Sequence, residues 1–172
     1  MTRAILLTGT LGAGKTAVAV EVGWLLSLRD VRVAVVDLDW LGWAHLGDEG
    51  RPGRSDELIA ANLAAIWPNY AAAGIDHLVL ARLLIRRSGL EGVRAALPGA
   101  DLKVVRLTAS PATLESRLRR RDSGRELDEH LRELAPSAEQ SAAVEADLVV
   151  ENDGAPLAEV AEQVLRRAGW WA

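Results

Sequence analysis

The sequence predicts an α/β protein built on a five-stranded parallel sheet with helices on both faces. Five strand-length runs rich in Val, Ile and Leu lack the strict polar alternation of half-exposed strands. Helical stretches separate these runs, and strands that alternate with helices along a chain form parallel sheets. The five runs are Ala4–Thr8, Val33–Asp37, His77–Ala81, Lys103–Leu107 and Asp147–Glu151.

Helices are expected between the strands. One begins at Lys15 and runs to Leu28. Ser110 and Pro111 favour another start, because a hydroxyl suits the N-cap and proline suits the first helical position. Apolar spacing predicts two further helices, one carrying Leu127, Leu131 and Leu134 and a last one within residues 157–168.

Another predicted helix contains an interruption. Its apolar residues share one face, but Pro68 is expected to kink or split it, because proline lacks an N–H and clashes with the preceding turn. These apolar residues are Ile59, Leu63, Ile66, Trp67 and Tyr70. The stretches 40–76 and 117–146 are the longest without a strand, so both are interpreted as insertions on one domain spanning residues 1–172.

Composition excludes several classes of protein. With 172 residues, 49% hydrophobic and 26% charged, the chain has ordinary globular usage and the length of one domain. It contains no cysteine, which excludes disulfides and thiolate metal sites. A net charge of −4 argues against nucleic acid as a partner, and charges break every long apolar run, which argues against a membrane span. The N-terminus shows no signal-peptide pattern, so a cytoplasmic location is expected.

A phosphate-binding motif follows the first strand. Residues 9–16 read Gly-Thr-Leu-Gly-Ala-Gly-Lys-Thr, which fits G-x-x-x-x-G-K-[ST] between a strand and a helix. In such a loop, backbone N–H groups curl around phosphate oxygens, the lysine reaches the β- and γ-phosphates, and the hydroxyl offers a ligand to Mg²⁺. The sequence therefore predicts a nucleotide and Mg²⁺ as ligands. The expected contacts are Gly9, Leu11, Gly12, Ala13, Gly14, Lys15 and Thr16, with Thr16 on the metal.

Two carboxylates follow the second strand, at the end of the sheet where parallel strands bind ligands. Strand alternation is expected to turn Asp37 and Asp39 the same way, toward the phosphates. One would help to hold Mg²⁺, and the other would accept the proton of an attacking hydroxyl. Asp37 is favoured for catalysis and is also a candidate metal ligand, because the sheet holds its backbone in place. The alternative is that one or both carboxylates only cap the following turn.

Together these features resemble the small P-loop kinases, the group that contains nucleoside monophosphate, shikimate and adenylylsulfate kinases. The resemblance rests on the loop at 9–16, the Asp-x-Asp at 37–39, the arginine-rich segment Arg117–Arg125 and the late strand whose end lies at 150–154. It implies a three-layer P-loop NTPase fold with strand order 2-3-1-4-5, an acceptor-binding region at about 40–76 and an arginine-bearing lid at about 117–135. It also implies that Asp37 binds or activates the acceptor with Asp39 as its companion, and that Arg117 and Asp153 contribute to nucleotide binding.

The end of the third strand departs from many P-loop proteins. Arg82 stands where they often carry an acidic magnesium ligand, which argues against a motor-type ATPase. No Asn-Lys-x-Asp guanine motif is present, which argues against a GTPase switch. Arg82 is a candidate contact for an anionic acceptor, and a surface position is the alternative.

The arginine-rich segment holds five guanidinium groups within nine residues, interrupted by a turn at 122–124 that is expected to be flexible. A lid that closes over the substrates would bring one or two arginines onto the transferring phosphoryl group. Arg121 and Arg125 flank the turn and are the favoured catalytic pair. The alternative is a solvated helix face.

Aromatic side chains lie near the expected acceptor region. Trp40 and Trp43 follow the carboxylates and are interpreted as an apolar wall for the acceptor, with core packing as the alternative. Asn62 and Trp67, on the helix expected to cover this region, would complete that pocket.

The remaining aromatic and imidazole groups are given structural interpretations. Trp170 and Trp171 at the C-terminal end indicate an anchor for the tail or a contact with a second subunit, so a homodimer is one expectation. The histidines lack the spacing of metal ligands and are interpreted as structural or surface residues; they are His45, His77 and His130.

The sequence thus predicts a kinase that transfers the γ-phosphate of ATP, with Mg²⁺, to a hydroxyl or phosphate group of a small-molecule acceptor. Two alternatives remain open: a nucleotide-binding regulatory module without transfer chemistry, and a phosphotransferase that modifies antibiotics. The missing carboxylate after the third strand permits the first alternative. A pocket lined by tryptophans would suit the second.

Overall fold

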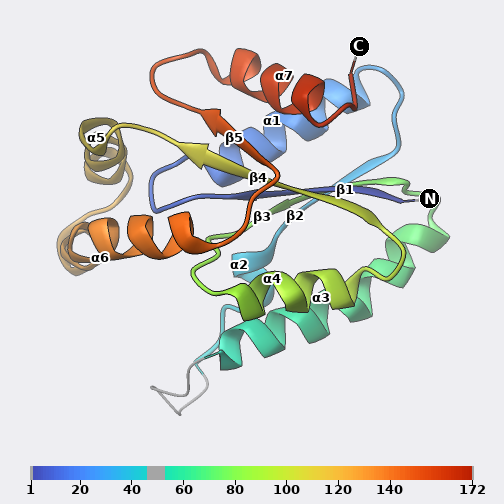
Figure 1. The fold of residues 1–172 in the computed structure, drawn as a ribbon, viewed down its shortest axis with the longest axis horizontal. Helices are drawn as coiled ribbons and strands as arrows, with labels where there is room; N and C mark the ends of the chain where they lie inside the picture. The colour runs from blue at the N-terminus through green and yellow to red at the C-terminus, as the bar shows by residue number, and fades with distance from the viewer. Residues whose placement is uncertain (1, 46–52, 172) are drawn as a thin grey trace.

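The structure, a computed structural model, describes residues 2–45 and 53–171 and confirms the α/β prediction (Figure 1). Five parallel strands form one sheet in the order β2-β3-β1-β4-β5, as the resemblance implied. All five predicted strands are present, with only small shifts of their ends. They are β1 (Arg3–Thr8), β2 (Val33–Asp37), β3 (His77–Ala81), β4 (Asp101–Thr108) and β5 (Leu148–Glu151).

Helices cover both faces of this sheet. Helices α1 and α7 pack together on one face, and α3 and α4 cover the other, so the domain has three layers (Figure 1). Helices α5 and α6 lie beyond the C-terminal end of β4 (Figure 1). The helices are α1 (Lys15–Ser27), α2 (Leu38–Leu41), α3 (Arg54–Ala72), α4 (Arg87–Ala96), α5 (Pro111–Arg121), α6 (Gly124–Ala143) and α7 (Leu157–Arg167).

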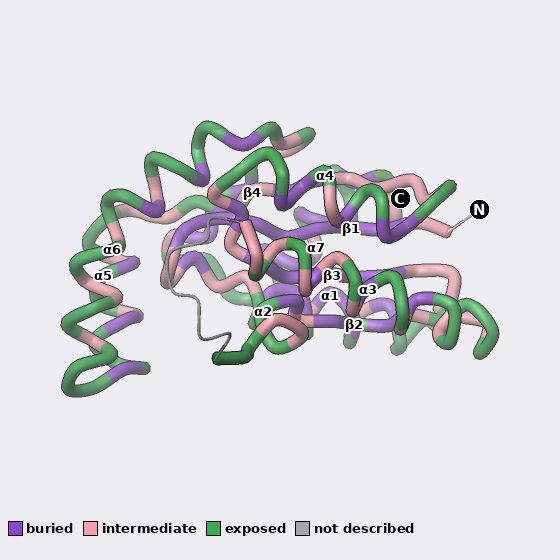
Figure 2. Tube along the Cα trace, turned by 90° about the horizontal axis from the view of Figure 1, so that it is seen from below, coloured by how far each residue is buried: buried purple, intermediate pink, exposed green. Residues whose placement is uncertain are grey.

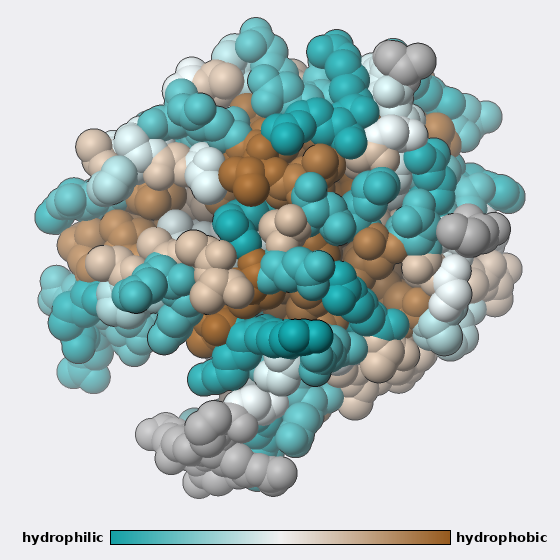
Figure 3. Space-filling model, in the orientation of Figure 1, coloured by the Kyte–Doolittle hydropathy of each residue, from teal (hydrophilic) through white to brown (hydrophobic). Residues whose placement is uncertain are grey.

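Burial on both faces of the sheet explains why the strands lack strict alternation. In β1, Ile5 and Leu7 belong to the core under α1 and α7, whereas Ala4 and Leu6 belong to the core under α3 and α4. Buried residues follow the strands through the middle of the molecule (Figure 2). On the face seen in Figure 3, hydrophilic side chains cover most of the surface, and apolar atoms show mainly between them near the centre.

Helix α3 is continuous, so the predicted split at Pro68 is wrong. The helix runs through Pro68 without a break. Pro68 and Ala64, whose carbonyl loses its helical partner, are both exposed, so water can satisfy that carbonyl. Leu63 and Trp67 anchor the opposite face of the helix in the core. Their burial outweighs the cost of one lost hydrogen bond.

The predicted acceptor-binding insertion at 40–76 is described in part. Its described residues form the end of α2, the turn that follows it and the whole of α3. Residues 46–52 lie outside the described residues. Among the helices that the structure describes, none is both long enough and apolar enough to cross a bilayer.

Candidate active site

The phosphate-binding motif forms the loop between β1 and α1, and its backbone requires glycine. Gly14 caps α1 in the left-handed region with φ 87°, and a Cβ there would lie 2.5 Å from Nδ2 of Asn152. A Cβ at Gly9, where φ is 136°, would lie 2.4 Å from the carbonyl oxygen of Leu107. The loop therefore lies tightly against its neighbours and presents the positive end of the α1 dipole at its mouth.

Two side chains brace this loop from outside. Nδ2 of Asn152, a buried residue just after β5, donates to the carbonyl of Ala13 at 2.9 Å. Arg117 donates to the carbonyl of Gly12 at 3.2 Å and to the carbonyl of Asn152 at 2.9 Å. Arg117, which the resemblance assigned to nucleotide binding, thus lies directly on the phosphate loop. Asn152 was predicted only as part of a turn, although its place directly after a strand indicates a position near the site.

Replacing Asn152 with alanine should weaken ATP binding. The substitution removes the donor to Ala13 and leaves a buried carbonyl unsatisfied at a cost of about 1–3 kcal/mol. Without this hydrogen bond the loop should be less rigidly held in its phosphate-binding conformation, and the Kd for ATP should rise about tenfold. Calorimetric titration with ATP and Mg²⁺ measures this effect. Asn69→Ala, at an exposed position of α3, is the control. Equal affinities in wild type and Asn152→Ala would show that this brace does not shape the loop.

Lys15 lies between two cavities at the mouth of the loop. One cavity has a volume of about 410 Å³ and the other about 470 Å³, and Lys15, Gly12, Thr16 and Arg121 line both. The Nζ atom of Lys15 donates to the carbonyl of Thr10 at 3.0 Å. Burial lowers the pKa of Lys15 to about 8, although the neighbouring carboxylates oppose this change. Lys15 therefore remains mainly protonated at neutral pH.

The two carboxylates after β2 have different surroundings. Asp37 lines the larger cavity, where its Oδ2 accepts from the Thr16 hydroxyl at 2.6 Å and its Oδ1 accepts from the Asp39 N–H at 3.0 Å. Asp37 is therefore the N-cap of α2, in agreement with the alternative that it caps the following turn. It is also the hydrogen-bond partner of the Thr16 hydroxyl. Asp39 lies within the helical turn, so the expected strand alternation does not apply to it.

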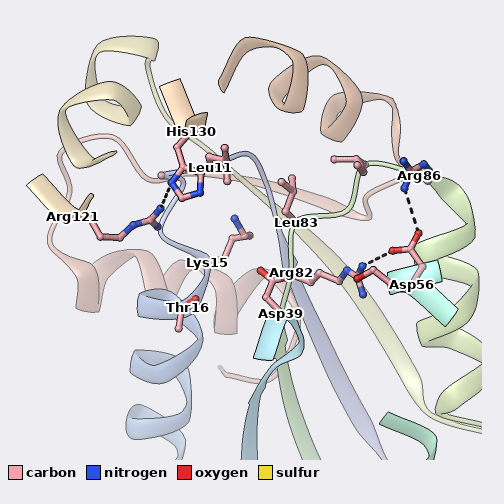
Figure 4. Close-up of a pocket in the computed structure, with 13 residues that line it drawn as sticks. Leu11, Lys15, Thr16, Asp39, Asp56, Arg82, Leu83, Arg86, Arg121 and His130 are labelled. Atoms are coloured by element: carbon pink, nitrogen blue, oxygen red, sulfur yellow. Dashed lines mark hydrogen bonds and ion pairs between the residues drawn. The ribbon is translucent and has the colours of Figure 1, made fainter. Parts of the chain in front are cut away.

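Asp39 lines the smaller cavity and faces basic groups. Burial raises its pKa, while Lys15 and Arg82 act in the opposite direction. Figure 4 shows Asp39 below Lys15 and beside Arg82, at the centre of the cavity. Asp39 and Asp37 therefore line different cavities on the two sides of Lys15.

The far wall of the smaller cavity is built from β3 and α3. Arg82, at the end of β3, forms an ion pair with Asp56 of α3, and their side chains are only 8% and 13% exposed. Arg86 lies 3.9 Å from the same carboxylate (Figure 4). Nε of Arg82 and Oδ2 of Asp56 are buried without a hydrogen-bond partner among the described residues. Arg82 was predicted here from its place at the strand end, whereas Asp56 was missed because only the fold brings it close.

The arginine-rich segment is helical on both sides of a two-residue connection. Asp122 in that connection is buried, and its carboxylate accepts from Arg121 at 2.6 and 3.0 Å and pairs with Nδ1 of His130 at 2.7 Å. Contacts among these three side chains link the connection to the ends of α5 and α6. Arg121 and His130 line the smaller cavity opposite Arg82 (Figure 4). His130, interpreted from sequence as structural or surface, thus reaches the site.

Replacing Asp122 with asparagine should destabilise the protein near neutral pH and have little effect in acid. The hydrogen bond from Arg121 and, after it, the one from His130 lower the pKa of Asp122 to about 2 from 3.8. A carboxyl whose pKa falls on folding stabilises the protein above its unfolded pKa and loses this contribution as the pH falls through its folded pKa. The difference in urea midpoint between wild type and variant should therefore shrink between about pH 4 and pH 2.

An exposed carboxylate on α6 supplies the control for this prediction. Asp128→Asn removes a charge of the same sign nearby without touching the Arg121–Asp122–His130 contacts. Its urea midpoint should follow that of the wild type across the same pH range. A difference for Asp122→Asn that stays constant down to about pH 2 would contradict the assignment.

The predicted aromatic wall is only partly present. Trp40 lines the larger cavity and is 72% exposed, and Trp43 packs beside it with ring centroids 6.0 Å apart but lines neither cavity. Trp67, predicted to contact the acceptor, is instead buried in the core under α3. Asn62 also lies outside both cavities, because its amide donates to the carbonyl of Leu41 and ties α3 to α2. The pocket prediction for Trp67 and Asn62 is therefore corrected.

Other predicted residues have structural contacts of their own. Leu11 lines the smaller cavity, as expected for the loop, whereas Arg125 is exposed and lines neither cavity. Asp153 accepts from the backbone N–H and the hydroxyl of Ser110, so it joins the end of β5 to the start of α5. Trp170 packs on His77, and Trp171 lies under the Arg29 guanidinium, which fits an anchor for the tail.

Comparisons with known proteins identify the fold. No family model matches the chain, and no characterised protein matches it by sequence. Among solved structures, it is similar to a sugar kinase from a Janibacter species, with a TM-score of 0.67 and 18% identity over 96% of this chain and 94% of that one. It is also similar to a shikimate kinase from Bacteroides thetaiotaomicron, with a TM-score of 0.64 and 20% identity over 97% of this chain and 98% of that one. A gluconokinase from Sinorhizobium meliloti has a TM-score of 0.63 and 21% identity over 97% of this chain and 91% of that one. The chain has the fold of the small P-loop kinase superfamily.

Proposed function

We propose that the protein is a kinase that transfers the γ-phosphate of ATP to a hydroxyl group of a small polar acceptor. The observation that supports this most strongly is the position of Lys15 between two cavities of different chemistry. Asp37 lines one of them, and Asp39 lines the other. A protein that only bound nucleotide would need the first cavity alone.

The larger cavity suits the phosphates and Mg²⁺. The Thr16 hydroxyl and the Asp37 carboxylate lie 2.6 Å apart and supply the oxygen ligands that Mg²⁺ prefers. Thr16 and Asp37 would hold Mg²⁺ here, and the charge of the ion would offset part of the phosphate charge during transfer. Asp37 also supplies the carboxylate that the end of β3 lacks, which weakens the case for a module without transfer chemistry. Lys15 and Arg121 provide positive charge where negative charge develops during transfer.

A third cavity extends the nucleotide site along α5. It has a volume of about 320 Å³, and Thr113, Arg117, Arg120 and Gly154 are among its lining residues. Arg117 lines both this cavity and the larger one, so the two adjoin at this side chain. The nucleoside portion of ATP would lie here, with the phosphates directed toward Lys15. Gly154 leaves this wall free of a side chain.

The smaller cavity suits an acceptor that carries several hydroxyl groups and one anionic group. The raised pKa of Asp39 makes it a better proton acceptor than an ordinary exposed carboxylate. Arg82 and Asp56, which form an ion pair with each other, add buried polar groups to the wall of this cavity. Arg86, which is 46% exposed, adds positive charge at the same wall. These groups favour a hydroxy acid or a phosphorylated sugar over a bulky apolar antibiotic.

An acceptor screen tests this function. ADP release would be measured with ATP and Mg²⁺ in the presence of sugars, sugar acids, sugar phosphates, nucleosides and hydroxylated antibiotics. The proposal expects release that depends on one class of hydroxylated anion. Release only with an antibiotic would favour the antibiotic-modifying alternative. Tight ATP binding without acceptor-dependent release across the whole screen would favour a regulatory module.

A further inference from the structure

One face of α1 is apolar and exposed. Val20, Trp24 and Leu28 are 57%, 61% and 66% exposed, and their four-residue spacing places them on one line along the helix. Between Thr16 and Ser27, Glu21 is the single charged residue of the helix. A helix that is apolar around most of its circumference is normally buried on more than one side. The sequence of α1 is therefore that of a helix with a second packing partner.

The same surface continues onto the edge of the sheet and to the nucleotide cavity. Strand β2 is an edge strand, and its Val35 is 36% exposed beside α1, close enough that a Cβ on Gly23 would lie 2.3 Å from it. At the other end of the helix, Ala17 and Trp40 line the larger cavity together. We name these residues the α1 patch: Val20, Trp24, Leu28, Val35 and Trp40.

We propose that the α1 patch is the interface of a homodimer in which two copies of α1 pack antiparallel across a two-fold axis at Trp24. Val20 and Leu28 lie four residues on either side of Trp24, about 6 Å along the helix in each direction. An antiparallel crossing at Trp24 therefore brings Val20 of each copy against Leu28 of the other. Contacts in which residue i meets j and j meets i define a closed two-fold interface.

The size and chemistry of the patch agree with this occupant. Its two tryptophans, 61% and 72% exposed, leave about 200–330 Å² of aromatic surface in contact with solvent, taking about 150–250 Å² for a whole aromatic side chain, and three exposed aliphatic side chains add to this area. A standard interface buries about 800 Å² per partner, of which somewhat more than half is apolar. A central tryptophan is the kind of residue that dominates binding energy. Between Thr16 and Ser27 the helix carries one charged residue, and apolar interfaces of this kind are typical of permanent complexes. A second copy of the same chain is a partner that is always available.

Sedimentation equilibrium tests the dimer directly. The wild type is expected at twice its chain mass of 18.5 kDa across the micromolar range. Trp24→Glu should sediment as a monomer, because it places a charge at the centre of the interface. Leu157→Glu is the matched control, since Leu157 is 39% exposed at the start of α7, outside the patch. A monomeric wild type at all concentrations, or a dimeric and folded Trp24→Glu, would overturn the proposal.

Crosslinking tests the geometry with the intact chain. The protein has no cysteine, so single cysteine variants report one position each. With a short bis-maleimide, Val20→Cys should crosslink to Leu28→Cys in a mixture of the two variants, and neither variant should crosslink efficiently to itself. Crosslinking of Val20→Cys with itself, without any to Leu28→Cys, would overturn the antiparallel arrangement. The proposal concerns association alone, so its result does not depend on whether an acceptor is found.

Discussion

Asp39→Asn should lower the rate of phosphoryl transfer by about 10²–10⁴, the range that a proton-accepting group contributes. The substitution keeps the shape of the side chain and removes the charge that we propose accepts the proton of the acceptor hydroxyl. Affinity for ATP should remain close to that of the wild type, because Asp39 lines the acceptor cavity and not the one that holds Asp37. The measurement is transfer to the acceptor found in the screen, at saturating ATP and Mg²⁺.

Asp37→Asn distinguishes the role of Asp37 from that of Asp39. Its side chain contacts Thr16, so the loss should appear as a higher Mg²⁺ requirement and weaker nucleotide binding. Excess Mg²⁺ should partly restore the transfer rate of Asp37→Asn, but it should not restore the transfer rate of Asp39→Asn. Full activity in Asp39→Asn, together with a defect in Asp37→Asn that Mg²⁺ does not relieve, would return the catalytic role to Asp37.

Lys15→Ala should abolish detectable turnover and reduce ATP affinity while the fold survives. Removing one preorganised charge from a phosphoryl-transfer site costs about 10²–10³ in rate. The Lys15 side chain donates to the Thr10 carbonyl and is not part of either hydrophobic core, so its loss should leave the packing of α1 unchanged. Calorimetry with ATP and circular dichroism measure the two effects separately.

The chain supplies a matched control for this variant. Lys103 in β4 is its only other lysine and lines none of the cavities at the site. Lys103→Ala should bind and turn over ATP like the wild type. Lys15→Ala with wild-type affinity and turnover would remove the basis for a phosphate site at this loop.

The architecture was predictable because it depends on local sequence patterns, namely apolar runs and one short motif. Strands buried on both faces appear as continuous apolar runs, and the loop at 9–16 needs fixed residue types at fixed spacing. Gly9 and Gly14 show the reason, because each has positive φ and no room for a Cβ. The place of Arg82 at a strand end made it a candidate contact, with a surface position as the alternative, and the structure places it in the wall of the smaller cavity.

The remaining parts of the site depend on contacts between distant segments. Trp67 and Asn62 share α3 with Asp56, but the orientation of the helix turns Trp67 into the core and ties Asn62 to α2, while Asp56 reaches the cavity. Asp39 was expected to continue the strand and to point the same way as Asp37. Instead, Asp37 caps the helical turn α2, and Asp39 lies within that turn. Sequence spacing does not encode such positions, because they are set by how the elements pack.

The most direct test of the account is to follow the γ-phosphoryl group itself. ATP labelled with ¹⁸O in the γ-phosphate would be incubated with Mg²⁺, protein and a mixture of hydroxylated anionic metabolites, and the products would be identified by mass spectrometry. The account predicts a labelled phosphoryl group on a hydroxyl of one metabolite class, formed by the wild type and by Lys103→Ala but not by Lys15→Ala or Asp39→Asn. Label found only in inorganic phosphate, or product formed equally by Asp39→Asn, would contradict it.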